Sequence, residues 1–416
     1  MNARGTGCVV RCLGGTLVAA LPGARVGDGI RVRASGGTSV TGRVAAVERA
    51  RVLVTPFQSL AGVAVGDRLE VAPEALQCVL GFGALGRAID GSGAPLDGRR
   101  ALRGSRHQIS SDSLTLTERR PVVTQCCTGI RAIDGLLAFG CGARVGIFGS
   151  PGSGKTMLLE AIVASSRADA VVVALIGERG REAQNWLGRA DRRTTIVCAT
   201  ADRSAAERVR AAETALAQAV VLSRQGLAVL FVVDSLARYV SALREQRNAL
   251  GEPVGRGGYP PSVWADFNVF VERAGNSAHG SITLVASVLA DGDEERDPIC
   301  VAARASLDGH IMLSSALGRA GRYPAIDVPA STSRTMHLVV DSTQRHDAEE
   351  VRRGMALLAA TEELRAAGLA NADEPRLARA LAGEELLEAF LRQREASSPE
   401  ATRSSLRLLA AALGSA

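Results

Sequence analysis

The chain has 416 residues and a formal net charge of +6, with 46% hydrophobic and 22% charged residues. A chain of this length and composition can bury a large core in two or three domains, which excludes a small disulfide-stapled scaffold and a disordered protein. Because the positive charge is spread along the whole sequence and only 3% of the residues are aromatic, we expect no nucleic-acid partner.

The cysteines and the apolar segments indicate the compartment. None of the eight cysteines forms a CxxC pair, and the five histidines do not cluster near them, so we expect no metal site built from these residues. The first residues lack the apolar core of a secretory signal, and no stretch reaches the ~18 uncharged apolar residues that cross a bilayer. The sequence therefore predicts a cytoplasmic protein with reduced cysteines.

Residues 1–75 predict a small N-terminal β-barrel. Short apolar stretches alternate here with glycines and other turn residues, a spacing typical of barrel strands. Residues from about 80 to 140 are rich in turns, and we expect them to connect the barrel to the next domain. The predicted strands are 7–12, 16–20, 29–32, 41–47 and 51–55.

Residues 76–345 predict an α/β domain, because strands alternate with helices after residue 144. Such alternation favours a mainly parallel sheet covered by helices on both faces. The residues after 346 are rich in Ala, Leu, Glu and Arg and predict a C-terminal helical domain, 346–416. The predicted strands are 144–148, 170–176, 227–233, 282–289 and 336–340, and the predicted helices are 155–164, 206–224, 348–367, 374–394 and 404–413.

A phosphate-binding loop lies between the strand at 144–148 and the helix at 155–164. The run Gly149-Ser150-Pro151-Gly152-Ser153-Gly154-Lys155-Thr156 matches GxxxxGK[ST]. In this motif backbone amides converge on phosphate oxygens, Lys155 reaches the β and γ phosphates, and Thr156 ligates Mg²⁺. Lys155 is also the only lysine among 49 Lys and Arg residues, which indicates a position that needs a compact ammonium. The sequence thus predicts a P-loop enzyme that binds ATP and Mg²⁺, with an incidental Gly-rich turn as the alternative.

Two acidic residues follow predicted strands. Asp234 ends the apolar run 227–233 and is placed to hold magnesium, although an aspartate here can also cap the next helix. Glu178 follows the strand after the P-loop helix, at the end of a parallel sheet where ligands bind. It is a candidate to orient or deprotonate the attacking water, or it belongs to a solvated cluster of charges.

Ordered motifs between about residues 80 and 345 resemble the protein-export ATPases of the rotary-type ATPase superfamily. The resemblance implies a RecA-like P-loop core. The sequence of residues 131–156 favours the type III secretion system ATPases over the closely similar flagellar export ATPases. The motifs include Ile176-Gly177-Glu178-Arg179-Gly180-Arg181-Glu182, Gly258-Tyr259-Pro260-Pro261-Ser262-Val263, Glu272-Arg273-Ala274-Gly275-Asn276, Leu307-Asp308-Gly309-His310-Ile311 and Tyr323-Pro324-Ala325-Ile326-Asp327-Val328.

The resemblance also implies catalytic roles. Glu178 would be the carboxylate that polarises the attacking water, and Arg179 would support it. Arg334 aligns with the arginine finger that completes the site of a neighbouring subunit, with an ordinary surface arginine as the alternative.

Three further residues are candidates to bind the nucleotide, and the same resemblance assigns two of them. Tyr323 would pack against adenine, unless it is a buried structural tyrosine. Arg238 would lie near the γ-phosphate, unless it forms a helix-surface ion pair. Met157 is the last residue of the predicted nucleotide-binding segment that begins at Gly149.

The function implied by the resemblance is ATP hydrolysis by a homohexameric ring that energises type III secretion, by releasing chaperones from exported proteins and unfolding them. Its expected partners are stator and stalk proteins and chaperone–effector complexes, which would hold it at the cytoplasmic face of the bacterial inner membrane. Alternatives are a flagellar export ATPase, a catalytic subunit of a proton or sodium ATPase, an RNA-translocating hexamer and a nucleotide-binding subunit that does not hydrolyse. The run Gly255-Arg256-Gly257-Gly258 departs from the family, which usually has two arginines there.

Overall fold

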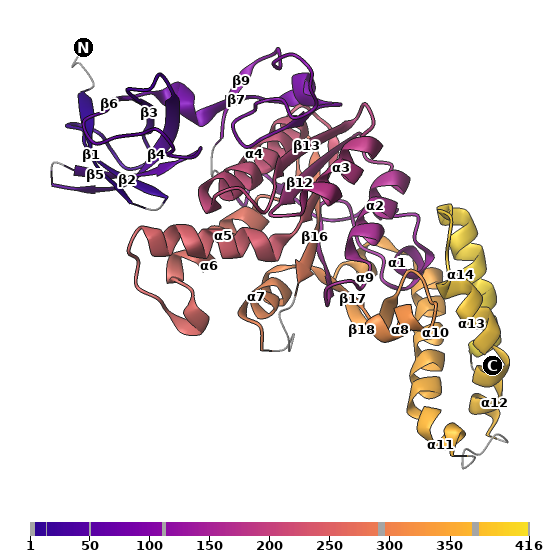
Figure 1. The fold of residues 1–416 in the computed structure, drawn as a ribbon. Coiled ribbons are helices and arrows are strands. Elements are labelled where there is room, and N and C mark those ends of the chain that lie inside the picture. The colour runs from indigo at the N-terminus through magenta and orange to yellow at the C-terminus, as the bar shows by residue number, and fades with distance from the viewer. Residues whose placement is uncertain are drawn as a thin grey trace. The chain divides into compact units, whose positions relative to one another are not determined.

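The structure is a computed structural model that describes residues 5–13, 15–49, 51–109, 114–289, 296–367 and 374–414. The chain divides into two compact units, and Figure 1 shows the elements of each. The first unit comprises Met1–Thr115 and Asp169–Arg273, and the second comprises Leu116–Ala168 and Ala274–Ala416.

The first unit begins with a closed antiparallel barrel in the strand order β1-β2-β5-β4-β3-β6 (Figure 1). Alternate apolar side chains such as Leu17, Ile30 and Val54 fill its interior, as the period of a strand requires. This confirms the predicted barrel and adds β6, a short strand that pairs with both β1 and β3 and closes the sheet. The strands are β1 (Thr6–Leu13), β2 (Thr16–Ala20), β3 (Gly29–Arg33), β4 (Ser39–Glu48), β5 (Arg51–Pro56) and β6 (Arg68–Val71).

A turn-rich connector follows the barrel in the same unit. Gln218 anchors it, because its side-chain amide both accepts from the backbone N–H of Gly81 at 2.6 Å and donates to the carbonyl of Gly81 at 3.0 Å. Arg87 and Asp97 brace one of its turns with a 2.6 Å ion pair. The elements are η1 (Pro73–Leu76), β7 (Gln77–Val79), η2 (Gly81–Ala84), β8 (Ala88–Ile89) and β9 (Arg106–Gln108).

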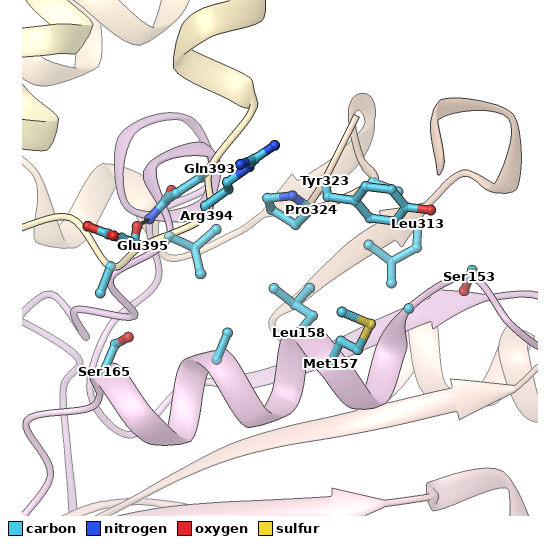
Figure 2. A pocket seen from close by; sticks show the side chains of 15 residues that line it. Ser153, Met157, Leu158, Ser165, Leu313, Tyr323, Pro324, Gln393, Arg394 and Glu395 are labelled. Atoms are coloured by element: carbon cyan, nitrogen blue, oxygen red, sulfur yellow. Dashed lines mark hydrogen bonds between the residues drawn. The ribbon is translucent and has the colours of Figure 1, made fainter. Parts of the chain in front are cut away.

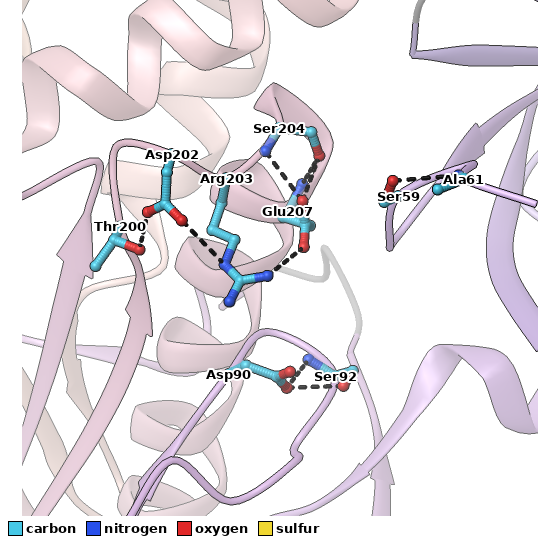
Figure 3. Close-up of polar contacts among 9 residues, drawn as sticks. All are labelled: Ser59, Ala61, Asp90, Ser92, Thr200, Asp202, Arg203, Ser204 and Glu207. Atoms are coloured by element: carbon cyan, nitrogen blue, oxygen red, sulfur yellow. Dashed lines mark hydrogen bonds and ion pairs between the residues drawn. The ribbon is translucent and has the colours of Figure 1, made fainter. Parts of the chain in front are cut away.

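The remainder of the first unit is a parallel sheet in the order β14-β12-β13-β8, with helices packed against it. Ser204 and Glu207 form a capping box at the start of α4, and Figure 3 shows the reciprocal contacts between them. The elements are β12 (Ala170–Ile176), α3 (Gly180–Arg189), β13 (Thr194–Ala199), α4 (Ala205–Arg224), β14 (Ala228–Asp234), α5 (Leu236–Ala249), η3 (Arg256–Gly258) and α6 (Pro261–Glu272).

The second unit contains strands in the order β18-β17-β11-β16, of which β17, β11 and β16 are parallel and β18 is antiparallel to β17. A short antiparallel strand, β15, pairs with β16 and with β10. The elements are β10 (Arg119–Arg120), α1 (Arg131–Leu136), β11 (Arg144–Gly149), α2 (Lys155–Ser165), β15 (Gly275–Ser277), β16 (Ser281–Leu289), α7 (Pro298–Ser306), β17 (Gly309–Leu313), α8 (Ser315–Arg319), β18 (Ile326–Ser333) and α9 (Met336–Val339).

The predicted strand at 336–340 is wrong. Residues Met336–Val339 form the one-turn helix α9, in which the N–H of Val340 donates to the carbonyl of Met336 at 3.2 Å. The position beside β17 is taken by β18, and the backbone N–H of Arg334 bonds to the carbonyl of Asp308 just before the chain turns away. A short, mainly apolar run does not by itself distinguish a strand from a short helix.

The second unit ends in helices, as predicted. The predicted helix at 374–394 is broken at Gly383, which ends α12 and begins α13, and the chain leaves α13 after Leu391. No helix within the described ranges combines the length and apolar character needed to span a membrane. The helices are α10 (Ser342–Ala360), α11 (Glu362–Ala366), α12 (Pro375–Ala382), α13 (Glu384–Leu391) and α14 (Pro399–Leu413).

Candidate functional site

The P-loop connects the buried strand β11 to the helix α2 in the second unit. Gly152 and Gly154 have φ values of 80° and 95°, in the left-handed region that favours glycine. A Cβ atom at either position would meet nothing within 4 Å, so glycine is required here for backbone conformation and not for space. This conformation lets the backbone turn sharply into the N-terminus of α2, where helix amides favour anions.

Lys155 is the first residue of α2 and is only 7% exposed. Its ammonium donates to the carbonyls of Gly149 and Ser150, each at 2.7 Å, and lies 3.4 Å from the Ser153 hydroxyl. An ammonium has three donors, and these contacts keep it within the loop. The structure thus places the single lysine of the chain at the centre of its phosphate-binding motif.

A pocket of about 190 Å³ lies over α2. Figure 2 shows Tyr323 and Pro324 on the opposite side of the pocket from Met157 and Leu158 of α2. Tyr323 is 53% exposed, so the alternative of a buried structural tyrosine is wrong. An aromatic ring facing apolar side chains beside a P-loop is a suitable slot for a flat aromatic ligand group.

Gln393 holds another wall of this pocket, although no motif in the sequence marks it. Its backbone N–H donates to the carbonyl of Tyr323 at 2.8 Å, and its side-chain oxygen accepts from the backbone N–H of Arg131 at 2.7 Å. Its side-chain nitrogen donates to the carbonyls of Gly129 and Glu395. A glutamine just after a helix gives no sequence signal of this role, since its partners are distant along the chain.

In the first unit, Glu178 and Asp234 lie at the carboxyl ends of neighbouring parallel strands. Leu175 of β12 stands opposite Asp234 of β14, and Glu178 follows β12 by two residues. Both carboxyl groups are buried, so Glu178 is not part of a solvated cluster of charges. Asp234 does not cap α5, because the N-cap is Ser235, whose hydroxyl accepts from the backbone N–H of Arg238.

Arg238 lies against Glu178. Its Nε is 3.1 Å from Oε1 of Glu178, and its Nη1 donates to the carbonyl of Gly177 at 2.7 Å. The contact with Glu178 is an ion pair without hydrogen-bond geometry. The alternative of a helix-surface ion pair therefore does not describe Arg238, because its partner is a buried carboxylate at the end of β12.

The carboxyl group of Glu178 has an unusual proton affinity. Burial, a hydrogen bond with Glu182 and the negative charge of Asp234 raise the pKa of Glu178 to about 8, while Arg238 opposes the rise. A carboxyl group with a pKa near the working pH can accept a proton from water more readily than an ordinary glutamate.

Of the remaining predicted residues, the two arginines are exposed and Thr156 is half-buried. Arg179 is the N-cap residue of α3 and is exposed. Arg334 follows β18, is exposed, and donates from Nη2 to the carbonyl of Arg304 at 3.2 Å. Thr156 is half-buried on α2. The structure thus brings the P-loop together with Met157 and Tyr323 in one unit, and Glu178 together with Asp234 and Arg238 in the other.

A P-loop between a parallel strand and a helix, in a chain that also has an N-terminal barrel and C-terminal helices, defines a P-loop ATPase of the rotary type. The nucleotide-binding domain of the ATP synthase alpha/beta family matches residues 129–333. The chain belongs to the family of type 3 secretion system ATPases and flagellum-specific ATP synthases, and is an ATP-hydrolysing enzyme of protein export.

Relatives from both branches of the family cover most of the chain. It is 40% identical to the type 3 secretion system ATPase of Sinorhizobium fredii, covering 94% of this chain and 88% of that protein. It is 38% identical to the flagellum-specific ATP synthase of Pseudomonas aeruginosa, covering 93% of this chain and 88% of that protein. The structure of the assembled ATPase EscN from the type III secretion system of enteropathogenic E. coli superimposes with a TM-score of 0.91 at 35% identity, covering 97% of this chain and 100% of that chain.

Proposed function

We propose that the chain forms a homohexameric ring that hydrolyses ATP with Mg²⁺ to energise type III secretion at the cytoplasmic face of the inner membrane. The observation that carries the proposal is the buried Glu178 beside Asp234 at the carboxyl ends of parallel strands, in a chain that also holds a complete P-loop. A subunit that binds nucleotide without hydrolysis has no use for a buried carboxyl group of raised pKa at this position.

Binding of ATP uses the residues of the second unit. The amides of the loop from Gly149 to Thr156 and the ammonium of Lys155 bind the phosphates. Tyr323 and Met157 enclose the adenine in the pocket over α2. Because Gln393 fixes the segment from 393 to 396, the pocket also joins the nucleotide to the C-terminal helices.

The residues fit a magnesium ion by their chemistry. Thr156 offers a hydroxyl and Asp234 a buried carboxylate, and hard oxygen ligands of this kind together with water suit Mg²⁺. When bound with ATP, the ion neutralises charge on the β and γ phosphates.

Hydrolysis breaks the bond between the γ-phosphorus and the bridging oxygen of ADP, and forms a bond from the same phosphorus to a water oxygen. Glu178 accepts a proton from this water, and the products are ADP and inorganic phosphate. Arg238 holds the Glu178 carboxylate in place, and Arg179 supports the same carboxylate. Arg334 of a neighbouring subunit stabilises the negative charge that develops on the γ-phosphate.

The proposed partners follow from the family. A structure of EscN contains its central stalk EscO, and we propose a corresponding stalk protein here, together with stator proteins and chaperone–effector complexes. The similar flagellar relative supports flagellar export as a second candidate.

The enzymatic part of the proposal is tested by phosphate release from ATP with and without Mg²⁺, for the wild-type chain and for Lys155→Ala. We expect hydrolysis only for the wild-type chain with Mg²⁺, and hydrolysis by Lys155→Ala would overturn the assignment. The cellular part is tested by expressing the chain in strains that lack either the secretion ATPase or the flagellar ATPase. Restored motility without restored secretion would replace the first candidate with the second.

A further inference from the structure

Arg334 is held by two hydrogen bonds where β18 ends. Its backbone N–H donates to the carbonyl of Asp308 at 2.9 Å, and its side-chain Nη2 donates to the carbonyl of Arg304 at 3.2 Å. Asp308 is itself fixed to β11, because its carboxylate accepts from the backbone N–H of Arg144 at 2.9 Å. The backbone of Arg334 is thus anchored through the sheet, whereas the direction of its guanidinium depends on Arg304.

The carbonyl of Arg304 belongs to the last turn of α7, which ends at Ser306. The last four carbonyls of an α-helix have no partner within the helix. The backbone N–H of Asp308, four residues after Arg304, donates instead to the carbonyl of Arg144 at 2.8 Å. The Arg304 carbonyl is therefore available to Arg334, and the negative end of the helix dipole favours a cation at this position.

The side chain of Arg304 ties this end of α7 to the sheet. Its guanidinium carbon lies 5.5 Å from the centre of the Phe148 ring, and its Nη2 donates to the sulfur of Met312 at 3.8 Å. Phe148 and Met312 stand opposite each other on the parallel strands β11 and β17, and Phe148 is fully buried. A cation over a buried ring is a favourable contact, so the last turn of α7 rests on a rigid surface.

His310 shares the surroundings of both arginines. Its ring packs edge-on against Phe148, with 6.1 Å between the ring centres. Burial and the positive charges of Arg304 and Arg334 lower the pKa of His310, so the ring is neutral near pH 7 and does not repel them. Arg334 is exposed, and a guanidinium has five N–H donors, so its bond to the Arg304 carbonyl leaves others for a phosphate.

We propose that Arg304 is a positioning residue for the arginine finger. Its side chain holds the end of α7 against Phe148 and Met312, and its carbonyl orients the guanidinium of Arg334 for the site of the neighbouring subunit. This inference rests on the proposed function, in which Arg334 acts on that neighbouring site. A donor that is already oriented stabilises the charge of the transition state without reorganisation, so loss of Arg304 should lower turnover and leave ATP binding unchanged.

Steady-state kinetics give the first test. Arg304→Ala should lower kcat at least ~10-fold and change the KM for ATP by less than ~2-fold. Arg304→Lys keeps a cation near Phe148 and should turn over at least ~3-fold faster than Arg304→Ala. The control is Arg353→Ala, which removes an exposed arginine paired with Glu350 on α10 and should behave as wild type. An unchanged kcat for Arg304→Ala, or a raised KM at unchanged kcat, would overturn the proposal.

Mixed rings distinguish an effect on the finger from an effect of Arg304 on its own P-loop through Phe148. A subunit with Arg304→Ala should use a neighbour's finger normally but supply a poor one. Its 1:1 mixture with Glu178→Gln should therefore exceed both variants alone and approach about a quarter of wild-type hydrolysis. Its mixture with Arg334→Ala should not exceed Arg304→Ala alone. The reverse pattern would mean that Arg304 acts on its own P-loop, and any pattern other than the predicted one overturns the proposal.

The mixture of Glu178→Gln with Arg334→Ala separates this inference from the proposed function. If that mixture recovers hydrolysis and the mixture of Arg304→Ala with Glu178→Gln does not, the shared site stands and the role of Arg304 is wrong. If the mixture of Glu178→Gln with Arg334→Ala forms rings but stays inactive, the shared site is wrong and the role of Arg304 falls with it.

Discussion

Arg238 contacts Glu178 through a 3.1 Å ion pair, and at the same time donates a hydrogen bond to the carbonyl of Gly177, the residue directly before Glu178. One side chain thus fixes both the backbone and the carboxylate at the end of β12. Gly177 has a φ of 70°, in the left-handed region that favours glycine, and a Cβ atom there would make a tight contact of 3.0 Å with Cδ of Arg238.

Removal of Arg238 should shift the pH dependence of hydrolysis. Arg238 lowers the pKa of Glu178, so Arg238→Ala should raise the apparent pKa of the rising limb of kcat/KM above about 8, by roughly one unit. The matched control is Arg208→Ala, since Arg208 pairs with Glu245 and not with Glu178. An unchanged profile for Arg238→Ala would mean that Glu178 is not the titrating base.

Glu178 should also destabilise the folded chain at alkaline pH. Its pKa is raised from 4.5 to about 8 by burial, so its contribution to stability is fully present below about pH 4.5 and is lost as the pH rises through about 8. Glu178→Gln removes this loss. In thermal or urea unfolding without nucleotide, the variant should gain stability relative to wild type between pH 5 and pH 9, by up to about 4 kcal/mol. A constant difference across this range would contradict the raised pKa.

Tyr323 should contribute to ATP affinity through its ring. Tyr323→Ala should raise the KM for ATP about 10-fold with little change in kcat, because the ring contacts the nucleotide equally before and during the reaction. Tyr323→Phe keeps the ring and should behave as wild type in the same steady-state assay. A large loss in Tyr323→Phe would show that the hydroxyl, and not stacking, is the important group.

Gln393 should couple the pocket to the C-terminal helices. Gln393→Ala removes hydrogen bonds to Arg131, Gly129 and Glu395 and should lower the free energy of unfolding by about 2 kcal/mol. It should also raise the KM for ATP, since the 393–396 wall loses its anchor. Gln344→Ala is the control, because Gln344 ties α10 to the carbonyl of Asp134 away from the pocket and should change stability without changing KM.

The arrangement of Glu178 and Arg334 can be tested by mixing two inactive variants. If each active site takes Glu178 from one subunit and Arg334 from its neighbour, a 1:1 mixture of Glu178→Gln and Arg334→Ala contains about a quarter of intact interfaces. Hydrolysis should return to at most that fraction of wild type. Mixtures that stay inactive while still forming rings, as judged by light scattering, would count against a shared site.

Features that are formed by residues close together in the chain could be predicted from the sequence. The P-loop is contiguous. Glu178 comes two residues after the apolar strand β12 and Asp234 ends β14, so their place at one edge of the sheet could be predicted from strand polarity. Strand assignment failed at 336–340, because a short apolar run fits a helical turn equally well.

Contacts between distant residues could not be predicted from the sequence. Gln393 reaches Gly129 across 264 positions, and nothing in its local sequence distinguishes it from a solvated glutamine. The pairing of Arg238 with Glu178 spans 60 positions (238 minus 178) and depends on how α5 follows β14. Resemblance to a family suggested that Arg238 matters, but only the fold identifies its partner.

The role of Glu178 as catalytic base is tested most directly by the steady-state ATP hydrolysis of Glu178→Gln. The dissociation constant of the same variant for ATP with Mg²⁺ is measured alongside. The amide keeps the shape of the side chain but cannot accept the proton of water. We expect affinity within about 3-fold of wild type and turnover reduced by at least ~100-fold. Turnover near the wild-type rate, with ATP bound normally, would contradict the assignment of Glu178 as the catalytic base.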